Sequence, residues 1–399
     1  MMTLEAVRTS PNALARYYGR FRVAERLLLT GHSHQAWPDC GFEGQAEAWL
    51  DAARHVDEKW EHASARAERV RRGFKRLLDD ADGDYALGAS THELVVRFLS
   101  GLPLRTRPRI VTTDGEFHTL RRQLDRLAEE RIELVRVAHA PAATVAERLA
   151  ARVDDRTAAV LVSAVFFSNG HVAPRLGHVH SACQRVGAEL LVDAYHALNV
   201  LPVSLRREGL QGAFVVGGGY KYCQLGEGNC FLRIPPDCAL RPVITGWFAE
   251  FDTLADGEAP LPVAYGPGAA RFAGATYDPT SHYRAVRVFD FFEQQELTPE
   301  FLREVSQHQV GLLERAFDAL DADPRLITRD RAVRLPQLGG FLALQSPRAE
   351  KVCRGLRNRG VLTDYRADVL RLGPAPYLSD AQLEGAIQAL GSVIQELGR

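Results

Sequence analysis

Short apolar runs that alternate with helix-length segments dominate the middle of the chain. Each run is rich in aliphatic residues and is followed by glycine or polar residues, which is typical of short buried strands. This alternation predicts an α/β domain in which helices cover both faces of a largely parallel sheet. The seven predicted strands are Asp84–Gly88, Arg109–Thr113, Ile132–Val137, Ala158–Phe166, Ala188–Ala194, Gly212–Gly219 and Gly228–Ile234.

The segments on either side of this region follow other patterns. Apolar residues at helical spacing predict helical structure over residues 44–79, and the passage after Gly246 is rich in turn residues until helices resume at Val286. We predict an N-terminal arm (1–45) that contributes to the small domain and the site mouth, a large α/β domain (46–284) and a small α+β domain (285–399). The predicted C-terminal elements are a helix at 299–322, a strand at 341–347, a helix at 348–358, strands at 360–366 and 369–374, and a helix from Ser379.

Charge and cysteine content narrow the class of protein. Lysine and arginine number 49 against 50 acidic residues, a balance that gives no attraction to nucleic acid or to anionic membranes, so small molecules are the expected partners. The six cysteines are scattered without the spacing of a metal site, so we expect no metal and a reducing compartment. The chain has neither a signal-peptide pattern nor an apolar run of about 18 residues. A cytoplasmic enzyme is therefore expected.

Polar residues follow the first two predicted strands, where ligands of open α/β sheets collect. Ser90 and Thr91 precede an apolar-faced helix, so their hydroxyls and the free backbone N–H groups could bind a phosphate; they could equally form an ordinary helix cap. Phe117 follows the second strand, where its ring could stack on a flat cofactor or simply join the core.

The strands near residues 190 and 215 end in the most informative residues. Asp193 ends a buried strand, and His196 follows; a carboxylate there needs a cationic partner, such as a protonated pyridine nitrogen, unless it caps the next segment. The motif Gly-Gly-Gly-Tyr220-Lys221 ends the next strand. Glycines let a ligand approach the backbone, and a half-buried lysine has the lowered pKa that Schiff-base chemistry requires. We therefore predict pyridoxal phosphate (PLP) anchored to Lys221, the alternative being a surface lysine.

Two further segments supply candidate substrate contacts. His32 and His34 lie in a turn-rich stretch after a short apolar strand, which could line a site mouth or only cap a domain. Arg366 and Arg371 fall in predicted C-terminal strands. An arginine there could hold a carboxylate bidentately or form a surface ion pair.

Three motifs in the same order resemble those of the kynureninases, in the class V aminotransferase group of fold type I PLP enzymes. They are DAYHALNVLPVSL, GGGYKYCQLGEG and DYRADVLRLGPAPYLSD, and the resemblance runs from about Arg26 to near the C-terminus. It implies a fold type I architecture and a homodimer with shared active sites. The roles that it implies are a Schiff base at Lys221, pairing of Asp193 with the pyridine nitrogen, support of the ring by His196, phosphate contacts from Tyr220, Ser90 and Thr91, stacking by Phe117, α-carboxylate binding by Arg371, and a phosphate contact from Thr276 in the neighbouring subunit.

The chain departs from the kynureninase pattern where the substrate's leaving group is expected. Where the family has a glycine-asparagine-serine-leucine turn, this chain has a turn with His32 and His34. Where the family has a tryptophan-rich segment that ends in histidine, Trp247 lies here in the segment Gly-Trp-Phe-Ala-Glu. The family's Asn-Pro element is Asp-Pro in this chain, and Tyr277 precedes it. The resemblance implies a hydrolase that cleaves the Cβ–Cγ bond of a 2-amino-4-oxo acid such as kynurenine, with Lys221, Tyr220 and Asp193 catalytic and His32, His34, Trp247, Tyr277 and Arg371 near the substrate. Alternatives are an aminotransferase, a β-lyase or desulfurase, or a non-catalytic PLP-binding protein.

Overall fold

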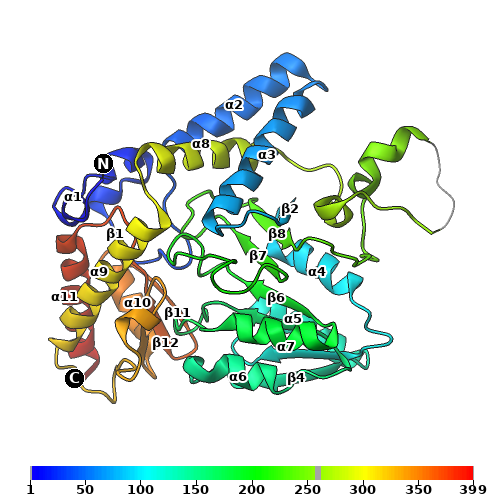
Figure 1. Cartoon of the computed structure of the whole chain (residues 1–399). Coiled ribbons are helices and arrows are strands. Elements are labelled where there is room, and N and C mark those ends of the chain that lie inside the picture. Colours follow the sequence, from blue (N-terminus) through cyan, green and yellow to red (C-terminus); the bar gives the residue numbers. More distant parts are fainter. Residues whose placement is uncertain (1, 257–261, 399) are drawn as a thin grey trace.

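The computed structural model describes residues 2–256 and 262–398, and its centre is a seven-stranded sheet (Figure 1). The strand order is β2-β8-β7-β6-β5-β3-β4, and within the described residues β8 is the strand that runs against the others. The prediction of a mostly parallel α/β sheet is confirmed. The strands are β2 (Asp84–Gly88), β3 (Arg109–Thr113), β4 (Glu133–Val137), β5 (Thr157–Ser163), β6 (Glu189–Asp193), β7 (Phe214–Gly218) and β8 (Cys230–Ile234).

Alternate side chains of the central strands enter two separate cores. Val160 and Val162 of β5 pack with the helices α6 (Val145–Ala150) and α7 (Leu176–Val186), whereas Leu161 packs with α4 (Thr91–Gly101) and α5 (His118–Glu129). Successive residues of a strand point to opposite faces, so a strand that is covered on both sides has to be apolar throughout. This is why β5 is buried along its whole length.

The C-terminal part forms a smaller unit with its own sheet. This sheet has the order β11-β12-β9 and is antiparallel, while β1 from the N-terminal segment pairs in parallel with β10. The N-terminal residues therefore lie against the C-terminal unit. The elements are β1 (Leu27–Leu28), β9 (Leu342–Gln345), β10 (Val361–Leu362), β11 (Asp364–Arg366), β12 (Val369–Leu372), α1 (Leu4–Arg8), α9 (Pro299–Asp318), α10 (Ala349–Asn358) and α11 (Asp380–Gly398).

The region of predicted helical pattern, residues 44–79, forms two helices, α2 (Cys40–His55) and α3 (Lys59–Leu77). The break falls at Val56, whose φ of 52° lies in the left-handed region, which is costly for a β-branched residue. Both helices pack against α8 (Thr280–Gln294), which leads from the large sheet towards the C-terminal unit.

The turn-rich passage after Gly246 projects away from the large sheet (Figure 1). It contains the short helices η4 (Trp247–Asp256) and η5 (Gly268–Phe272); residues 257–261 of this predicted linker lie outside the described residues. The remaining short helices are η1 (Ala15–Phe21), η2 (Val23–Glu25), η3 (Ala142–Thr144) and η6 (Leu335–Gln337). Across the described chain, every helix is too short or too polar to cross a bilayer.

Candidate active site

The carboxyl edge of the sheet brings Asp193, His196 and Lys221 together. Asp193 ends β6, and Lys221 follows the glycines that end β7, the adjacent parallel strand. The two loops fold over the edge, so that Lys221 Nζ lies 2.6 Å from His196 Nε2. Both side chains are buried, and this pairing joins two residues that are 25 positions apart in the sequence.

Burial sets the protonation of Lys221. Its side chain is only 6% exposed, and this desolvation lowers the pKa to about 7, although the charge of Asp193 opposes the change; the positive charge of Arg371 lowers the pKa further. A substantial share of Lys221 is therefore the neutral amine at neutral pH. A neutral amine is the form that attacks a carbonyl and accepts a proton.

Asp193 is half-buried at this edge, and His196 is buried with a ring nitrogen that has no hydrogen-bond partner among the described residues. Burial raises the pKa of Asp193, against the effects of one hydrogen bond from Tyr195 N (2.9 Å) and of the nearby Lys221. Burial and then Lys221 lower the pKa of His196 well below its usual value, so the imidazole is neutral. Its Nδ1 has no partner among the described residues. A cationic or hydrogen-bonding ligand at this edge would satisfy groups that the protein leaves unpaired.

Aromatic rings surround the amine of Lys221. The Nζ atom lies 4.8 Å from the ring centroid of Tyr195, 5.5 Å from that of Phe117 and 5.8 Å from that of Tyr220. Tyr220 also stacks on His34, with centroids 4.8 Å apart and planes 21° apart. Phe117 begins α5 from the loop that follows β3. The sequence-predicted Phe117, Tyr220 and His34 therefore belong to one wall around Lys221.

Arg371 is held rigidly on the side of the C-terminal unit. Its guanidinium donates to Asp364 through Nε (2.9 Å) and Nη2 (2.5 Å) and to the carbonyl of Phe167 through Nη1 (2.7 Å). Asp364 also binds His32 Nε2 at 2.8 Å. Burial alone would raise the pKa of Asp364, but His32 and Arg371 lower it well below its usual range, whereas burial lowers the pKa of His32 to about 4. A neutral His32 thus fixes Asp364, which in turn orients Arg371.

The ends of β2, β8 and β7 place Ser90 and Thr91 at the same edge of the sheet. Gly88 pairs with Cys230 of β8, which also pairs with Gly218 of β7. Ser90 caps α4, its Oγ accepting a hydrogen bond from Glu93 N at 3.3 Å. The cap that the sequence offered as an alternative is thus present, and α4 begins just after the end of β2, at the edge of the sheet that carries Lys221.

The described structure places Trp247, Thr276 and Tyr277 away from Lys221. Trp247 contacts the rings of Phe248 and Phe251 and is 43% exposed. Tyr277 contacts Trp60, Phe248 and His282, and Thr276 is exposed. Within one chain, these three residues are therefore not part of the site around Lys221.

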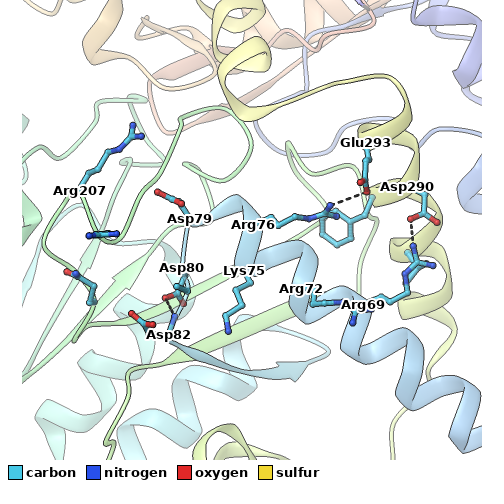
Figure 2. A pocket seen from close by; sticks show the side chains of 15 residues that line it. Arg69, Arg72, Lys75, Arg76, Asp79, Asp80, Asp82, Arg207, Asp290 and Glu293 are labelled. Carbon is cyan, nitrogen blue, oxygen red and sulfur yellow. Dashed lines mark hydrogen bonds and ion pairs between the residues drawn. The ribbon is translucent and has the colours of Figure 1, made fainter.

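A hollow of about 1410 Å³ lies elsewhere, between α3, α8 and the segment around Arg207 (Figure 2). Two of its arginines are ion-paired, Arg69 with Asp290 and Arg76 with Glu293 (3.1 Å), as the dashed lines in Figure 2 show. Most of its remaining charged side chains are exposed to solvent. It is a solvated charged surface rather than the active site. Within the described residues, no cluster of three or more potential metal ligands occurs either.

Sequence reasoning missed three residues of the site: Glu116, Tyr195 and Asp364. Tyr195 lies between Asp193 and His196, and Glu116 directly precedes Phe117. The signal for Asp364 is its position opposite Arg371 in an antiparallel hairpin, which requires knowledge of the turn between β11 and β12.

Comparison with known proteins agrees with this geometry. Residues 302–390 match the family model of the kynureninase C-terminal domain. The kynureninase of Pseudomonas fluorescens is 26% identical over 406 positions, covering 96% of this chain and 93% of that protein. The uncharacterized aminotransferase YcbU of Bacillus subtilis is 21% identical over 381 positions, covering 92% and 96%.

Solved structures share the fold over nearly the full length. A C-DES variant with glycine covalently linked to its PLP cofactor has a TM-score of 0.79 at 16% identity, covering 94% of this chain and 98% of that chain. The cysteine desulfurase CsdA of Escherichia coli has a TM-score of 0.76 at 14% identity, covering 99% of both. The chain is thus similar in sequence to kynureninases and shares the fold type I architecture, and these matches support PLP as its cofactor.

Proposed function

We propose that this protein is a PLP-dependent hydrolase of the kynureninase type, which cleaves the Cβ–Cγ bond of a 2-amino-4-oxo acid. The observation that carries the proposal is the convergence of a buried lysine of lowered pKa, a half-buried carboxylate and a fixed arginine at one edge of the sheet. This combination provides an amine, an acid for a ring nitrogen and a carboxylate-binding group.

The residues at this edge fit PLP. Lys221 would be the covalent anchor, Asp193 would pair with the pyridine nitrogen, Phe117 would pack on the ring, and His196 and Tyr220 would contact its periphery. The unpaired Nδ1 of His196 is a buried group that such a ring could satisfy, and the carboxylate of Asp193 accepts a hydrogen bond from Tyr195 N. When bound, PLP supplies an electron sink for negative charge at the substrate α-carbon.

The protein's own residues then bind the substrate and move protons. Arg371 would bind the α-carboxylate through the N–H groups that Asp364 and Phe167 leave free, and the Lys221 amine would accept the α-proton. His32 is engaged with Asp364 and keeps Arg371 in place, so Tyr220 and the exposed His34 are better proton donors towards the γ-carbonyl. This assigns His32 to substrate positioning.

A homodimer would complete the site. Thr276 is proposed to reach the phosphate of the neighbouring subunit, and Trp247 and Tyr277 its substrate. Support comes from the projecting segment, where apolar side chains such as Val243 (81% exposed), Ile244 and Phe251 face solvent. Inactive Lys221→Ala and Thr276→Ala chains should regain activity when mixed, because a mixed dimer has one intact site. A cytoplasmic location fits the six cysteines, which form no disulfide.

The test of this function is product release. Purified protein with PLP should convert kynurenine or 3-hydroxykynurenine to alanine and the corresponding anthranilate, and Lys221→Ala should abolish the reaction. Release of neither anthranilate would refute these substrates, and a screen of aliphatic 2-amino-4-oxo acids would then decide the reaction type. Bound PLP converted to its amine form by an amino acid alone would indicate an aminotransferase instead.

A second candidate is a carbon–sulfur β-lyase, because C-DES, a cystine C–S lyase, shares the fold. A desulfurase is disfavoured by the cysteines. Four are buried, and burial raises the pKa of the partly exposed Cys40 to about 12, which suppresses its thiolate. Release of pyruvate and a persulfide from cystine, without anthranilate from kynurenine, would favour the lyase. A non-catalytic protein would bind PLP yet leave every such substrate unchanged.

A further inference from the structure

Glu116 is a buried acid at the site to which the proposed reaction gives no role. It is 3% exposed and lies in the loop between the end of β3 and Phe117. Placing a carboxylate in such an environment is costly unless it receives hydrogen bonds. Its retention next to a predicted cofactor-stacking residue therefore requires a physical reason.

Three donors converge on this carboxylate. Its Oε1 accepts from Thr113 Oγ1 at 2.6 Å and from Ser163 N at 3.3 Å, and its Oε2 accepts from Ser163 Oγ at 2.6 Å. Thr113 ends β3 and Ser163 ends β5, which are neighbouring parallel strands. The carboxylate thus ties the loop that carries Phe117 to the adjacent strand end.

The hydrogen bonds of Glu116 also link it to the strand end that carries Asp193 on β6. Ser163 is the register partner of Asp193 on the adjacent strand, and Ala164 N donates to the carbonyl of Asp193 at 2.9 Å. Paired residues of parallel strands point to the same face, so Glu116, Ser163 and Asp193 form a row along the sheet edge. Burial raises the pKa of Glu116 to about 7 against its three hydrogen bonds, and the charge of Asp193 adds to the rise.

We propose that Glu116 is a positioning residue of the cofactor site, which holds Phe117 against the PLP ring and keeps Asp193 aligned with the ring nitrogen. This inference rests on the proposed PLP function and goes beyond it. Glu116 acts through Thr113 and Ser163 and need not touch the cofactor. Both ends of the loop are fixed, since Thr113 Oγ1 also accepts from Gly115 N at 3.1 Å.

The test compares Glu116→Ala and Glu116→Gln with the matched control Glu189→Ala. Glu189 is a partly buried acid that begins β6 at the opposite edge of the sheet, far along the strand from Asp193. PLP is titrated into each cofactor-free protein while visible absorbance and circular dichroism are recorded, and the melting temperature without PLP reports folding.

We expect Glu116→Ala to raise the Kd for PLP by about 10- to 100-fold, the range typical when a group that orients direct ligands is lost. The induced circular dichroism of the bound cofactor should weaken, because Phe117 no longer fixes the ring. Glu116→Gln should lie between Ala and the parent, since its amide oxygen still accepts one hydrogen bond, and Glu189→Ala should match the parent.

A folded Glu116→Ala protein with the parent's Kd and dichroism would overturn the inference. Should this variant not fold, Ser163→Ala, which removes one hydroxyl donor, must shift Kd and dichroism in the same direction, and an unchanged Ser163→Ala would overturn it equally. Failure of the parent itself to bind PLP is a different result. It would refute the proposed function and this inference with it.

Discussion

Replacement of Lys221 by Met should stabilise the protein in the absence of PLP. Burial lowers the pKa of Lys221 from its ordinary 10.5 to about 7. At about 1.4 kcal/mol per pH unit, burying the charged amine therefore lowers the free energy of unfolding by about 5 kcal/mol. Methionine keeps the length of the side chain and carries no proton. Below pH 7 the variant should therefore gain up to about 5 kcal/mol in free energy of unfolding.

The pH dependence separates this effect from packing. Between pH 7 and about 10.5 the unfolded chain binds the lysine proton more tightly than the folded one, so the parent's stability rises with pH. The advantage of Lys221→Met should thus fall to about 2 kcal/mol near pH 9 and disappear above about pH 10.5. Urea unfolding of PLP-free protein at several pH values measures it, with exposed Lys351→Met as control. A difference that does not change with pH would refute the reasoning.

Three other predictions concern the groups around the site and the core. Arg371→Met should raise KM for the amino-acid substrate at least 10-fold in steady-state assays while leaving the Kd for PLP near the parent's, because the proposed role of the guanidinium is to bind the substrate carboxylate. Equal loss of PLP binding would contradict this role. Asp364→Asn should lower the free energy of unfolding at pH 7, and the loss relative to the parent should shrink as the pH falls below about 4, because a carboxyl of lowered pKa stabilises the fold only while it is ionised. A loss that stays constant when unfolding is measured at decreasing pH would contradict this prediction. Arg233→Met should lower the free energy of unfolding in urea by about 3–5 kcal/mol, because Asp80 would remain buried without its cation. The control Arg207→Met, at an exposed position, should change this free energy little. A loss below about 1 kcal/mol for Arg233→Met would be inconsistent with the buried ion pair.

The strands were predictable because buried parallel strands are continuous apolar runs. All seven runs of the large domain form strands, with ends that shift by a few residues, as for Ala158–Phe166, where β5 covers Thr157–Ser163. The break between α2 and α3 was not predictable in the same way. No glycine or proline marks Val56, and the helical periodicity continues on both sides of it.

The candidate site was predictable where each residue adjoins a strand end. Asp193, His196 and Lys221 meet because β6 and β7 are neighbours. Residues whose role depends on pairing between distant segments were harder to find. Asp364 requires the hairpin register, Glu116 requires the adjacency of β3 and β5, and the surroundings of Trp247 and Tyr277 within one chain do not include Lys221.

The most direct measurement is to find where PLP attaches. The chain has four lysines, Lys59, Lys75, Lys221 and Lys351, of which Lys221 is the buried one. The protein is incubated with PLP, reduced with borohydride and digested. The pyridoxyl group should then be found on the peptide that contains Lys221, at about one group per chain. Amino-acid substrate added before the reduction should diminish this label. Labelling spread over the exposed lysines, or absent from Lys221, would contradict the account.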